Sequence, residues 1–169
     1  MEKKALYNLS YGVFMLSTRS GEKVNGCITN TCMQVANDPI RIAISVLNSN
    51  YTCDLIKESG IFALSLLDVQ CSFETIKHFG FQSGRDVDKA EELGLTYEEP
   101  ETVSVPGIKE LPLTLECRVV YKQTQDTSAM TEENRDKFYP QNVDSLFTGS
   151  NRDTHVAYYG EIINAYVIE

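Results

Sequence analysis

Small hydrogen-bonding side chains are concentrated in residues 25–34, which read NGCITNTCMQ. A half-buried strand normally alternates apolar with polar residues, but this stretch gathers such side chains around a single isoleucine, Ile28. A strip of this kind can line a polar ligand. It can equally be a turn at Asn25-Gly26 followed by side chains that satisfy neighbouring backbone groups. The polar members are Asn25, Thr29, Asn30, Thr31 and Gln34.

Residues 48–52 (NSNYT) precede a predicted helix and could bind an anion. The exposed N–H groups and the dipole of a helix start favour negative charge, and the Thr52 hydroxyl could bond a phosphate oxygen. Thr52 could also be an ordinary cap of the first helical turn. The pattern is therefore compatible with a phosphate site without requiring one.

Residues 81–89 (FQSGRDVDK) open another predicted helix and carry two cations, Arg85 and Lys89, four residues apart. This spacing would place both on one helical side. An arginine fork and a lysine point charge could together hold a phosphate. The alternative is a solvated helix start with Ser83 as its cap.

His155 stands just before the last predicted strand and is the candidate for proton chemistry, although a lone histidine is often structural. Tyr158 and Tyr159 could flank a flat ring or belong to the core and rim of a sheet. The chain has 2 histidines and 5 cysteines, and no two cysteines form a C-x-x-C pair. These counts favour reduced thiols and predict neither a disulfide framework nor a metal site.

The chain has 169 residues, of which 42% are hydrophobic, so we expect one domain over residues 1–169 with a substantial core. Its 24 acidic and 15 basic residues give a net charge of −9, which argues against a general nucleic-acid or anionic-membrane binder. There is no apolar run of the ~20 residues that a membrane span needs, and no signal-like block. We therefore expect a cytoplasmic protein.

Strands are predicted where apolar and β-branched residues run between turn signals: 11–18, 23–30, 40–47, 61–67, 113–121 and 155–168. The run 40–47 is apolar on both faces, so it should be buried on two sides. Short helices are predicted over 52–59, 72–79 and 86–93, each followed by a glycine stop. Many strands joined by hairpins, with a few short helices, indicate a mainly β fold, a barrel with helical decoration.

Residues 125–152 differ from the rest of the chain because they are rich in polar residues and interrupted by Pro140. We interpret them as a surface excursion that could act as a lid. A short helix is possible over residues 131–138.

Several segments, read together, resemble the flavin reductase-like family of FMN-binding split barrels, and among them the flavin domain of high-molecular-weight rubredoxins. The resemblance covers about residues 5–125 and resumes at Asp153. The evidence for this resemblance is the order and spacing of many motifs, because no single motif is specific enough. These motifs are LSYGVFMLST (9–18), NGCITNT (25–31), QV (34–35), DP (38–39), the helix around YT (51–60), HFGFQSGRD (78–86) and DTHVAYYGEI (153–162).

The resemblance implies a homodimeric split barrel that binds FMN noncovalently near the dimer interface. It implies that Asn25, Thr29, Asn30 and Thr31 line the flavin ring. It also implies that Thr52 binds the ribityl-phosphate end. Lys89 matches the family's basic residue, with Ser83 and Arg85 in support. His155 matches a histidine close to the flavin, and Tyr158 lies where an aromatic often approaches the ring.

The implied activity is hydride transfer from NADH or NADPH to FMN, followed by electron transfer to free flavin, rubredoxin, a flavodiiron protein or oxygen. The sequence has no paired C-x-x-C segments, so we expect no rubredoxin domain within it and a separate electron acceptor. An FMN-holding electron carrier reduced by another protein is the alternative. A pyridoxal-phosphate or haem-handling relative is a third class. The excursion 125–152 has no counterpart in the resemblance.

Overall fold

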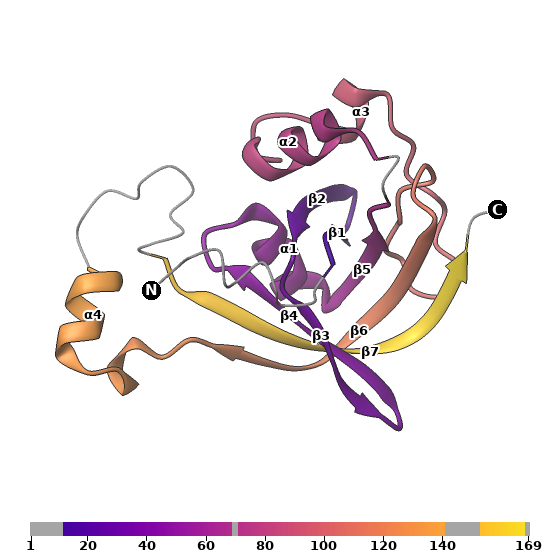
Figure 1. Cartoon of the computed structure of the whole chain (residues 1–169). Helices are drawn as coiled ribbons and strands as arrows, with labels where there is room; N and C mark the ends of the chain where they lie inside the picture. Colours follow the sequence, from indigo (N-terminus) through magenta and orange to yellow (C-terminus); the bar gives the residue numbers. More distant parts are fainter. Residues whose placement is uncertain (1–11, 69–70, 141–152, 168–169) are drawn as a thin grey trace.

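Seven antiparallel strands form one sheet in the order β2-β1-β5-β6-β7-β4-β3 (Figure 1). The computed structural model describes residues 12–68, 71–140 and 153–167. The strands are β1 (Phe14–Ser20), β2 (Lys23–Thr29), β3 (Cys32–Asn37), β4 (Ile40–Leu47), β5 (Ile61–Leu66), β6 (Leu113–Thr124) and β7 (His155–Val167). The helices are α1 (Tyr51–Ser59), α2 (Phe73–Phe81), α3 (Lys89–Leu93), the 3-10 turn η2 (Thr127–Ala129) and α4 (Glu132–Phe138).

The two strands at the ends of the sheet order, β2 and β3, follow each other in the chain with only Asn30 and Thr31 between them. The Ser45 N–H of β4 donates to the Thr31 carbonyl over 3.3 Å, so this connection bonds to the strand beside β3. The curled sheet is therefore joined at one end of β2 and β3 and left open elsewhere. This is a split barrel, as predicted, and the polar strip of the sequence lies at the joined end.

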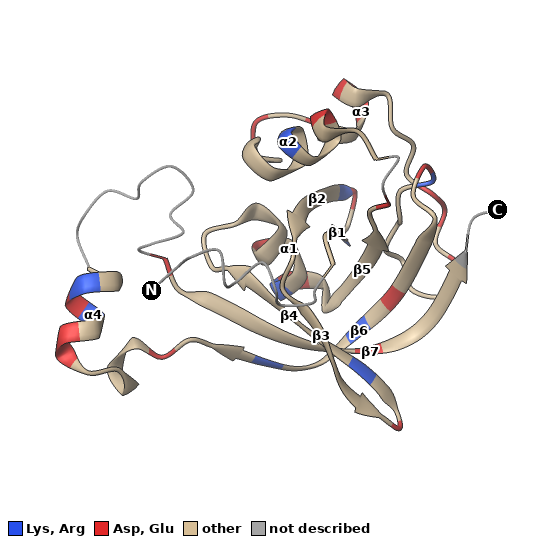
Figure 2. Ribbon diagram, in the orientation of Figure 1, with Lys and Arg blue, Asp and Glu red and all other residues tan. Residues whose placement is uncertain are grey.

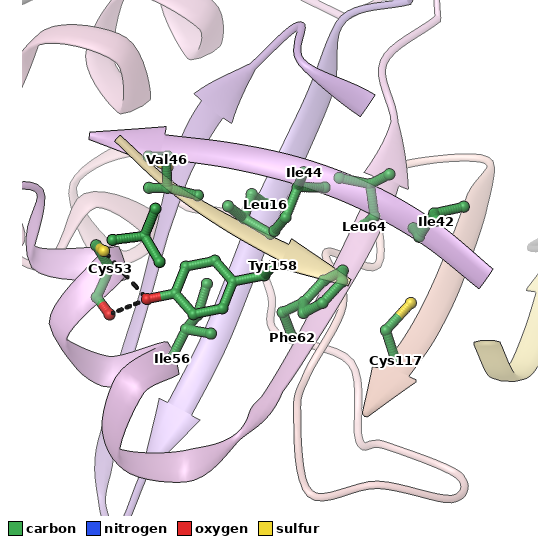
Figure 3. Packing of buried hydrophobic residues seen from close by; sticks show 12 residues of the cluster. Leu16, Ile42, Ile44, Val46, Cys53, Ile56, Phe62, Leu64, Cys117 and Tyr158 are labelled. Atoms are coloured by element: carbon green, nitrogen blue, oxygen red, sulfur yellow. Dashed lines mark hydrogen bonds between the residues drawn. The ribbon is translucent and has the colours of Figure 1, made fainter. Parts of the chain in front are cut away.

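Side chains from six strands (β1, β2, β4, β5, β6 and β7) and from α1 fill the barrel around Tyr158 (Figure 3). The Tyr158 side chain is fully buried, and its hydroxyl donates to the Cys53 carbonyl over 3.2 Å. The Cys53 sulfur lies 3.2 Å from the Tyr158 hydroxyl oxygen. α1 contributes Cys53 and Ile56 to this cluster. The helix start that borders the candidate site is thus fixed to the core.

Some element boundaries differ from the sequence predictions. β4 is not buried on two sides, because its residues alternate between buried and partly exposed. α2 continues through Gly80 and ends at the cap Gln82, whereas the glycine predicted a stop. α3 begins only at Lys89, with Asp88 as its cap. The short edge strand β3 was not predicted.

The long ladder between β6 and β7 continues beyond the barrel as far as the pair Thr124 and Val156. η2 and α4 follow this extension and stand apart from the barrel (Figure 1). We call residues 125–140 the arm. The arm is the described part of the predicted excursion, and residues 141–152 lie outside the described residues. The structure contains the helix predicted near residues 131–138.

No helix in the described part of the chain is long and apolar enough to cross a membrane.

Candidate functional site

Three adjoining pockets follow one another along the joined end of the barrel. The cationic pocket, about 490 Å³, lies between the start of α1, the end of α2 and the loop before α3, and Arg85 and Lys89 line it. The central pocket, about 410 Å³, is lined by the β2–β3 connection and shares Leu47 and Asn50 with the first. The arm pocket, about 520 Å³, shares His155 with the central pocket. Because neighbouring pockets share lining residues, we describe the three together as one groove.

Lys89 is a buried cation, with only 3% of its surface exposed. Its Nζ donates to the carbonyls of Gly26 and, over 3.4 Å, Gln82, and lies 5.3 Å from the centre of the Phe79 ring. No carboxylate of the described residues forms an ion pair with it. Burial lowers the pKa of Lys89, and the nearby Cys27 opposes this shift. A buried ammonium without a counter-ion is costly, so this pocket suits an anion.

Arg85 lies in the loop before α3, so it does not share a helical face with Lys89 as predicted. Its guanidinium bonds Asp54 Oδ2 at 2.5 Å and the Ser49 carbonyl at 3.2 Å, and it lies over the Tyr51 ring at 5.1 Å. Arg85 is half exposed and already paired with a carboxylate. It can therefore contribute less uncompensated charge to the pocket than Lys89.

Ser83 also lines the cationic pocket, and its hydroxyl accepts the Arg85 N–H over 3.2 Å. The structure thus brings Ser83, Arg85 and Lys89 to one pocket, as the sequence predicted, although α3 is capped by Asp88 instead of Ser83.

Asn25 and Thr52 are buried below the groove and bond each other, with Asn25 Nδ2 donating to Thr52 Oγ1 over 2.8 Å. The cap of α1 is Asn50, whose side chain accepts the Thr52 N–H, so Thr52 is not the cap. Gly84 packs on Asn25 so closely that a Cβ there would overlap the Asn25 side-chain oxygen. These two residues therefore join β2, α1 and the loop before α3, and as placed they support the groove without lining it.

Thr29, Asn30 and Thr31 line the central pocket. The two threonine hydroxyls lie 2.9 Å apart, and Thr31 Oγ1 donates to the Ser45 carbonyl over 2.7 Å. These bonds hold the connection in shape. The side chain of Asn30 makes no hydrogen bond within the described residues and is exposed to the pocket region, so it is free to bond a ligand.

His155 begins β7 and borders both the central and the arm pockets. Its main chain is held by Gln125, whose N–H donates to the His155 carbonyl over 2.8 Å. Tyr158, in contrast, lies in the core and borders none of the three pockets. Its phenol is directed at Cys53, so the expected contact with a ring in the groove has no support in the structure.

Sequence reasoning missed the residues that the end of β6 and the arm add to the groove. Gln123, Gln125 and Asp126 line the arm pocket together with Ser45 of β4. This pocket is lined by residues from the end of β6, from β4 and from β7. These segments come together only through the order of strands in the sheet, which a local sequence pattern cannot predict. The one available signal was the change of composition at residue 125.

Residues 6–169 match the flavin reductase like domain family, which is nearly the whole chain. The chain belongs to this family. A ferric-chelate reductase (NAD(P)H) from Archaeoglobus fulgidus is 31% identical over 121 residues, 71% of this chain and 70% of that protein. A high molecular weight rubredoxin from Moorella thermoacetica is 37% identical over 89 residues, 53% of this chain but 39% of the rubredoxin. This flavin reductase-like chain therefore matches well under half of that relative.

Solved structures of flavin reductase-like proteins share the fold. The flavoredoxin of Methanosarcina acetivorans superposes with a TM-score of 0.66 at 28% identity, covering 94% of this chain and 69% of the flavoredoxin. The resemblance read from the sequence is thereby confirmed at the level of family and fold.

Proposed function

We propose that this flavin reductase-like protein binds FMN in the groove and acts as an NAD(P)H-dependent oxidoreductase that passes electrons to a separate acceptor. The observation that carries the proposal is Lys89, a buried ammonium without a carboxylate partner among the described residues, at one end of the groove. Such a cation is stabilised when a phosphate group lies beside it. The family to which the chain belongs supports the identity of the ligand as a flavin.

The residues along the groove fit the parts of FMN. Lys89, assisted by Ser83 and Arg85, would hold the phosphate in the cationic pocket. Thr29, Asn30 and Thr31 would face the ring with uncharged hydrogen-bonding groups. FMN, when bound, supplies the redox chemistry, accepting a hydride and releasing electrons, so no side-chain nucleophile is needed.

His155 lines both the central and the arm pockets. We assign it the role of orienting the nicotinamide or of providing a hydrogen bond or proton at the edge of the ring. A second substrate would enter through the arm pocket, because this pocket shares Ser45 and His155 with the central pocket. The NAD(P)H-dependent relative supports this choice of donor.

The acceptor is a separate molecule in this proposal. A rubredoxin or a flavodiiron-type protein fits best, because one relative is a high molecular weight rubredoxin and a structural relative is a flavoredoxin. Free flavin and oxygen are the simpler acceptors.

Anaerobic stopped-flow mixing of the FMN-loaded protein with NADH or NADPH tests the proposal. Bleaching of the flavin absorbance at physiological nicotinamide concentrations is the expected result. If FMN does not bind in a titration, or if neither nicotinamide bleaches it, the reductase assignment is wrong.

An electron carrier is the second candidate, and the likeness to a flavoredoxin favours it. A carrier would bind FMN with the same residues, but its flavin would be bleached only by a reduced protein donor. The same stopped-flow apparatus, with a reduced ferredoxin or rubredoxin in place of the nicotinamide, separates the two functions.

We further propose that the protein is a homodimer that uses the β3–β4 hairpin as part of its interface. Three apolar side chains of this hairpin are exposed: Met33 (66%), Val35 (41%) and Ile40 (52%). Between Cys32 and Leu47 the only charged residues are Asp38 and Arg41, and the hairpin is mostly uncharged in Figure 2. An apolar edge of this kind is normally covered by another surface.

A further inference from the structure

The β6–β7 ladder ends in an unusual way at Gln125 and His155. The Gln125 N–H donates to the His155 carbonyl over 2.8 Å, which continues the ladder one step beyond the pair Thr124 and Val156. In a regular antiparallel pair the return bond would run from the His155 N–H to the main-chain carbonyl of residue 125. Here the His155 N–H donates to the side-chain oxygen, Gln125 Oε1, over 3.2 Å. A side chain has taken the place of the main chain.

Because the Gln125 side chain accepts the His155 N–H, the main chain after Gln125 is free to turn away from β7. Directly after Gln125, Asp126 caps η2, accepting the Ser128 N–H over 2.8 Å and the Ser128 hydroxyl over 2.6 Å. The strand therefore stops at this point and the arm begins. Because the Gln125 side chain completes the ladder, His155 keeps both of its main-chain bonds despite the turn.

The other half of the Gln125 amide is bonded to the arm. Gln125 Nε2 donates to the Tyr139 hydroxyl over 2.9 Å. Tyr139 caps α4, where its N–H donates to the Arg135 carbonyl over 2.8 Å. A single amide group thus links the end of α4 to the first residue of β7.

The main chain is what locates the His155 side chain. Within the described residues, the imidazole makes no hydrogen bond or ion pair. The backbone at His155 therefore determines where its side chain begins. The strand next to it anchors this backbone through the Asn48 N–H, which donates to the Thr154 carbonyl over 2.8 Å, and Gln125 bonds the N–H and the carbonyl of His155 itself.

We propose that Gln125 is a positioning residue for His155: its side-chain amide fixes the start of β7 so that the imidazole stands between the central and the arm pockets. The inference rests on the function proposed for His155. It goes beyond that function because it gives the arm a part in the reaction. The arm holds the histidine in place through Gln125 and Tyr139, in addition to lining a pocket.

Two substitutions separate positioning from stability. Gln125→Met keeps the length of the side chain but removes both the acceptor for His155 and the donor for Tyr139. Gln125→Glu restores the acceptor, and the Tyr139 hydroxyl can then donate to the carboxylate. Gln123→Ala is the matched control, because Gln123 lines the same pocket but pairs with Ala157.

The first measurement is NMR of the protein without FMN, with ¹⁵N-labelled histidine. We expect Gln125→Met to shift or broaden the His155 amide and imidazole signals, Gln125→Glu to restore them, and Gln123→Ala to leave them in place. Unchanged His155 signals in Gln125→Met would overturn the proposal. This readout does not depend on whether the protein reduces FMN.

The second measurement is the rate of FMN reduction at saturating nicotinamide, with FMN affinity measured separately. Misplacing a group by a fraction of an ångström to 1 Å lowers a rate strongly, so we expect a loss of about 10-fold in Gln125→Met. FMN affinity and the nicotinamide KM should change less than about twofold, since both sites remain formed. Gln125→Glu should recover the rate to within about threefold.

The outcomes distinguish this proposal from the proposed function. If the unaltered protein is not reduced by either nicotinamide, the reductase assignment fails, while the NMR result still decides the role of Gln125. If Gln125→Met lowers FMN affinity and rate by the same factor, or if Gln125→Glu is as slow as Gln125→Met, Gln125 is a general structural residue and the positioning role is wrong.

Discussion

At the scale of single residues, Lys89 has opposite effects on folding and on binding. Burying its charge costs stability when no anion is present, and the same charge stabilises a bound phosphate. We expect Lys89→Met to weaken FMN binding by about 30-fold or more, since a charge-assisted hydrogen bond contributes about 2 kcal/mol. The same variant should unfold no more easily than the unaltered protein when FMN is absent. Fluorescence titration and urea unfolding measure the two effects.

Lys77→Met is the control for that experiment, because Lys77 is exposed on α2 and loses the same charge. Lys77→Met should leave both the FMN affinity and the free energy of unfolding nearly unchanged. A Lys89→Met protein that binds FMN normally would contradict the assignment of the phosphate to the cationic pocket.

The lowered pKa of Lys89 also predicts a dependence on pH. Its pKa in the unfolded chain is near the ordinary 10.5, and burial lowers the pKa in the folded protein. Between these two values the unfolded chain holds the proton and the folded protein does not, so the contribution of Lys89 to the free energy of unfolding rises with pH. The stability difference between Lys89→Met and the unaltered protein, both without FMN, should therefore narrow as the pH is raised toward 10.5.

Buried thiols titrate in the same range with the opposite sign. Burial raises the pKa of Cys27, Cys53 and Cys117 above the ordinary 9.0, so their contribution is lost as pH rises. The loss at Cys53 and Cys117 is shared by both proteins and cancels in the comparison. Cys27 interacts with Lys89, so the stability difference reports Lys89 together with Cys27. FMN affinity should fall over the same range as Lys89 loses its charge. A stability difference that stays constant with pH would show that Lys89 is not the titrating group.

His155 gives the prediction for catalysis. We expect His155→Ala to slow NAD(P)H-dependent reduction at least about 10-fold while changing FMN affinity much less, because the imidazole borders the pockets without closing the cationic end. Stopped-flow kinetics measure the reduction rate, and titration measures the FMN affinity. Equal losses in rate and affinity would reject the role.

The sequence indicated those site residues whose contacts lie within one short segment, and it missed those whose partners are far away along the chain. Lys89 and Ser83 lie in one short loop and helix start, so their shared pocket followed from spacing. Thr52 looked like a cap and a phosphate ligand, yet it bonds Asn25 from another element and is buried. Gln125 had no signal of its own, because its partner His155 is 30 residues away along the chain.

At the scale of elements, Glu116 of β6 holds the loop that follows α3. Its carboxylate is fully buried and accepts the backbone N–H groups of Glu101, Thr102 and Val103 over 2.8, 2.9 and 3.2 Å. Glu116→Ala would leave these three donors without their partner, so we expect a loss of about 3 kcal/mol or more in the free energy of unfolding. Urea unfolding measures the loss, and hydrogen exchange should be faster at the three amides.

Glu110→Ala is the matched control, since the Glu110 carboxylate also accepts a backbone N–H, that of Thr96, over 3.1 Å, but is exposed. Water can replace an exposed acceptor, so the cost should stay below about 1 kcal/mol. Equal costs for the two variants would show that burial of the Glu116 carboxylate is not what makes it important.

The elements show why local patterns succeed in one place and fail in another. Strands β2 and β5 were predicted nearly to their ends, because β-branched runs and turn residues bound them. β3 was missed, since its exposed apolar side chains and its pairing to β4 do not give a buried periodicity. Gly80 did not stop α2, because packing of Phe79 in the core holds the last turn in helical form.

At the scale of the whole molecule, the joined end of the barrel determines where a site can form. β2 and β3 meet there through Asn30 and Thr31, and the arm extends from β6 to the same region at His155. The order of the sheet therefore gathers the groove from segments that lie far apart in the sequence. The β1–β2 hairpin could be predicted from the sequence because a short turn joins its strands. The pairing of β4 with β7 could not, because it joins residues more than one hundred positions apart.

The β3–β4 hairpin gives the prediction that belongs to this scale. Met33 is an exposed apolar residue on the edge strand β3, and Ile40 is an exposed apolar residue at the turn of the same hairpin. A charge at either position would be costly to bury against a second copy. We expect Met33→Glu with Ile40→Glu to convert the proposed dimer to a monomer in sedimentation velocity. Phe73→Glu is the control: Phe73 is even more exposed, at 74%, but lies on α2, so the dimer should persist. A protein that is monomeric before any substitution, or a dimer that survives the paired glutamates, would exclude the hairpin as the interface.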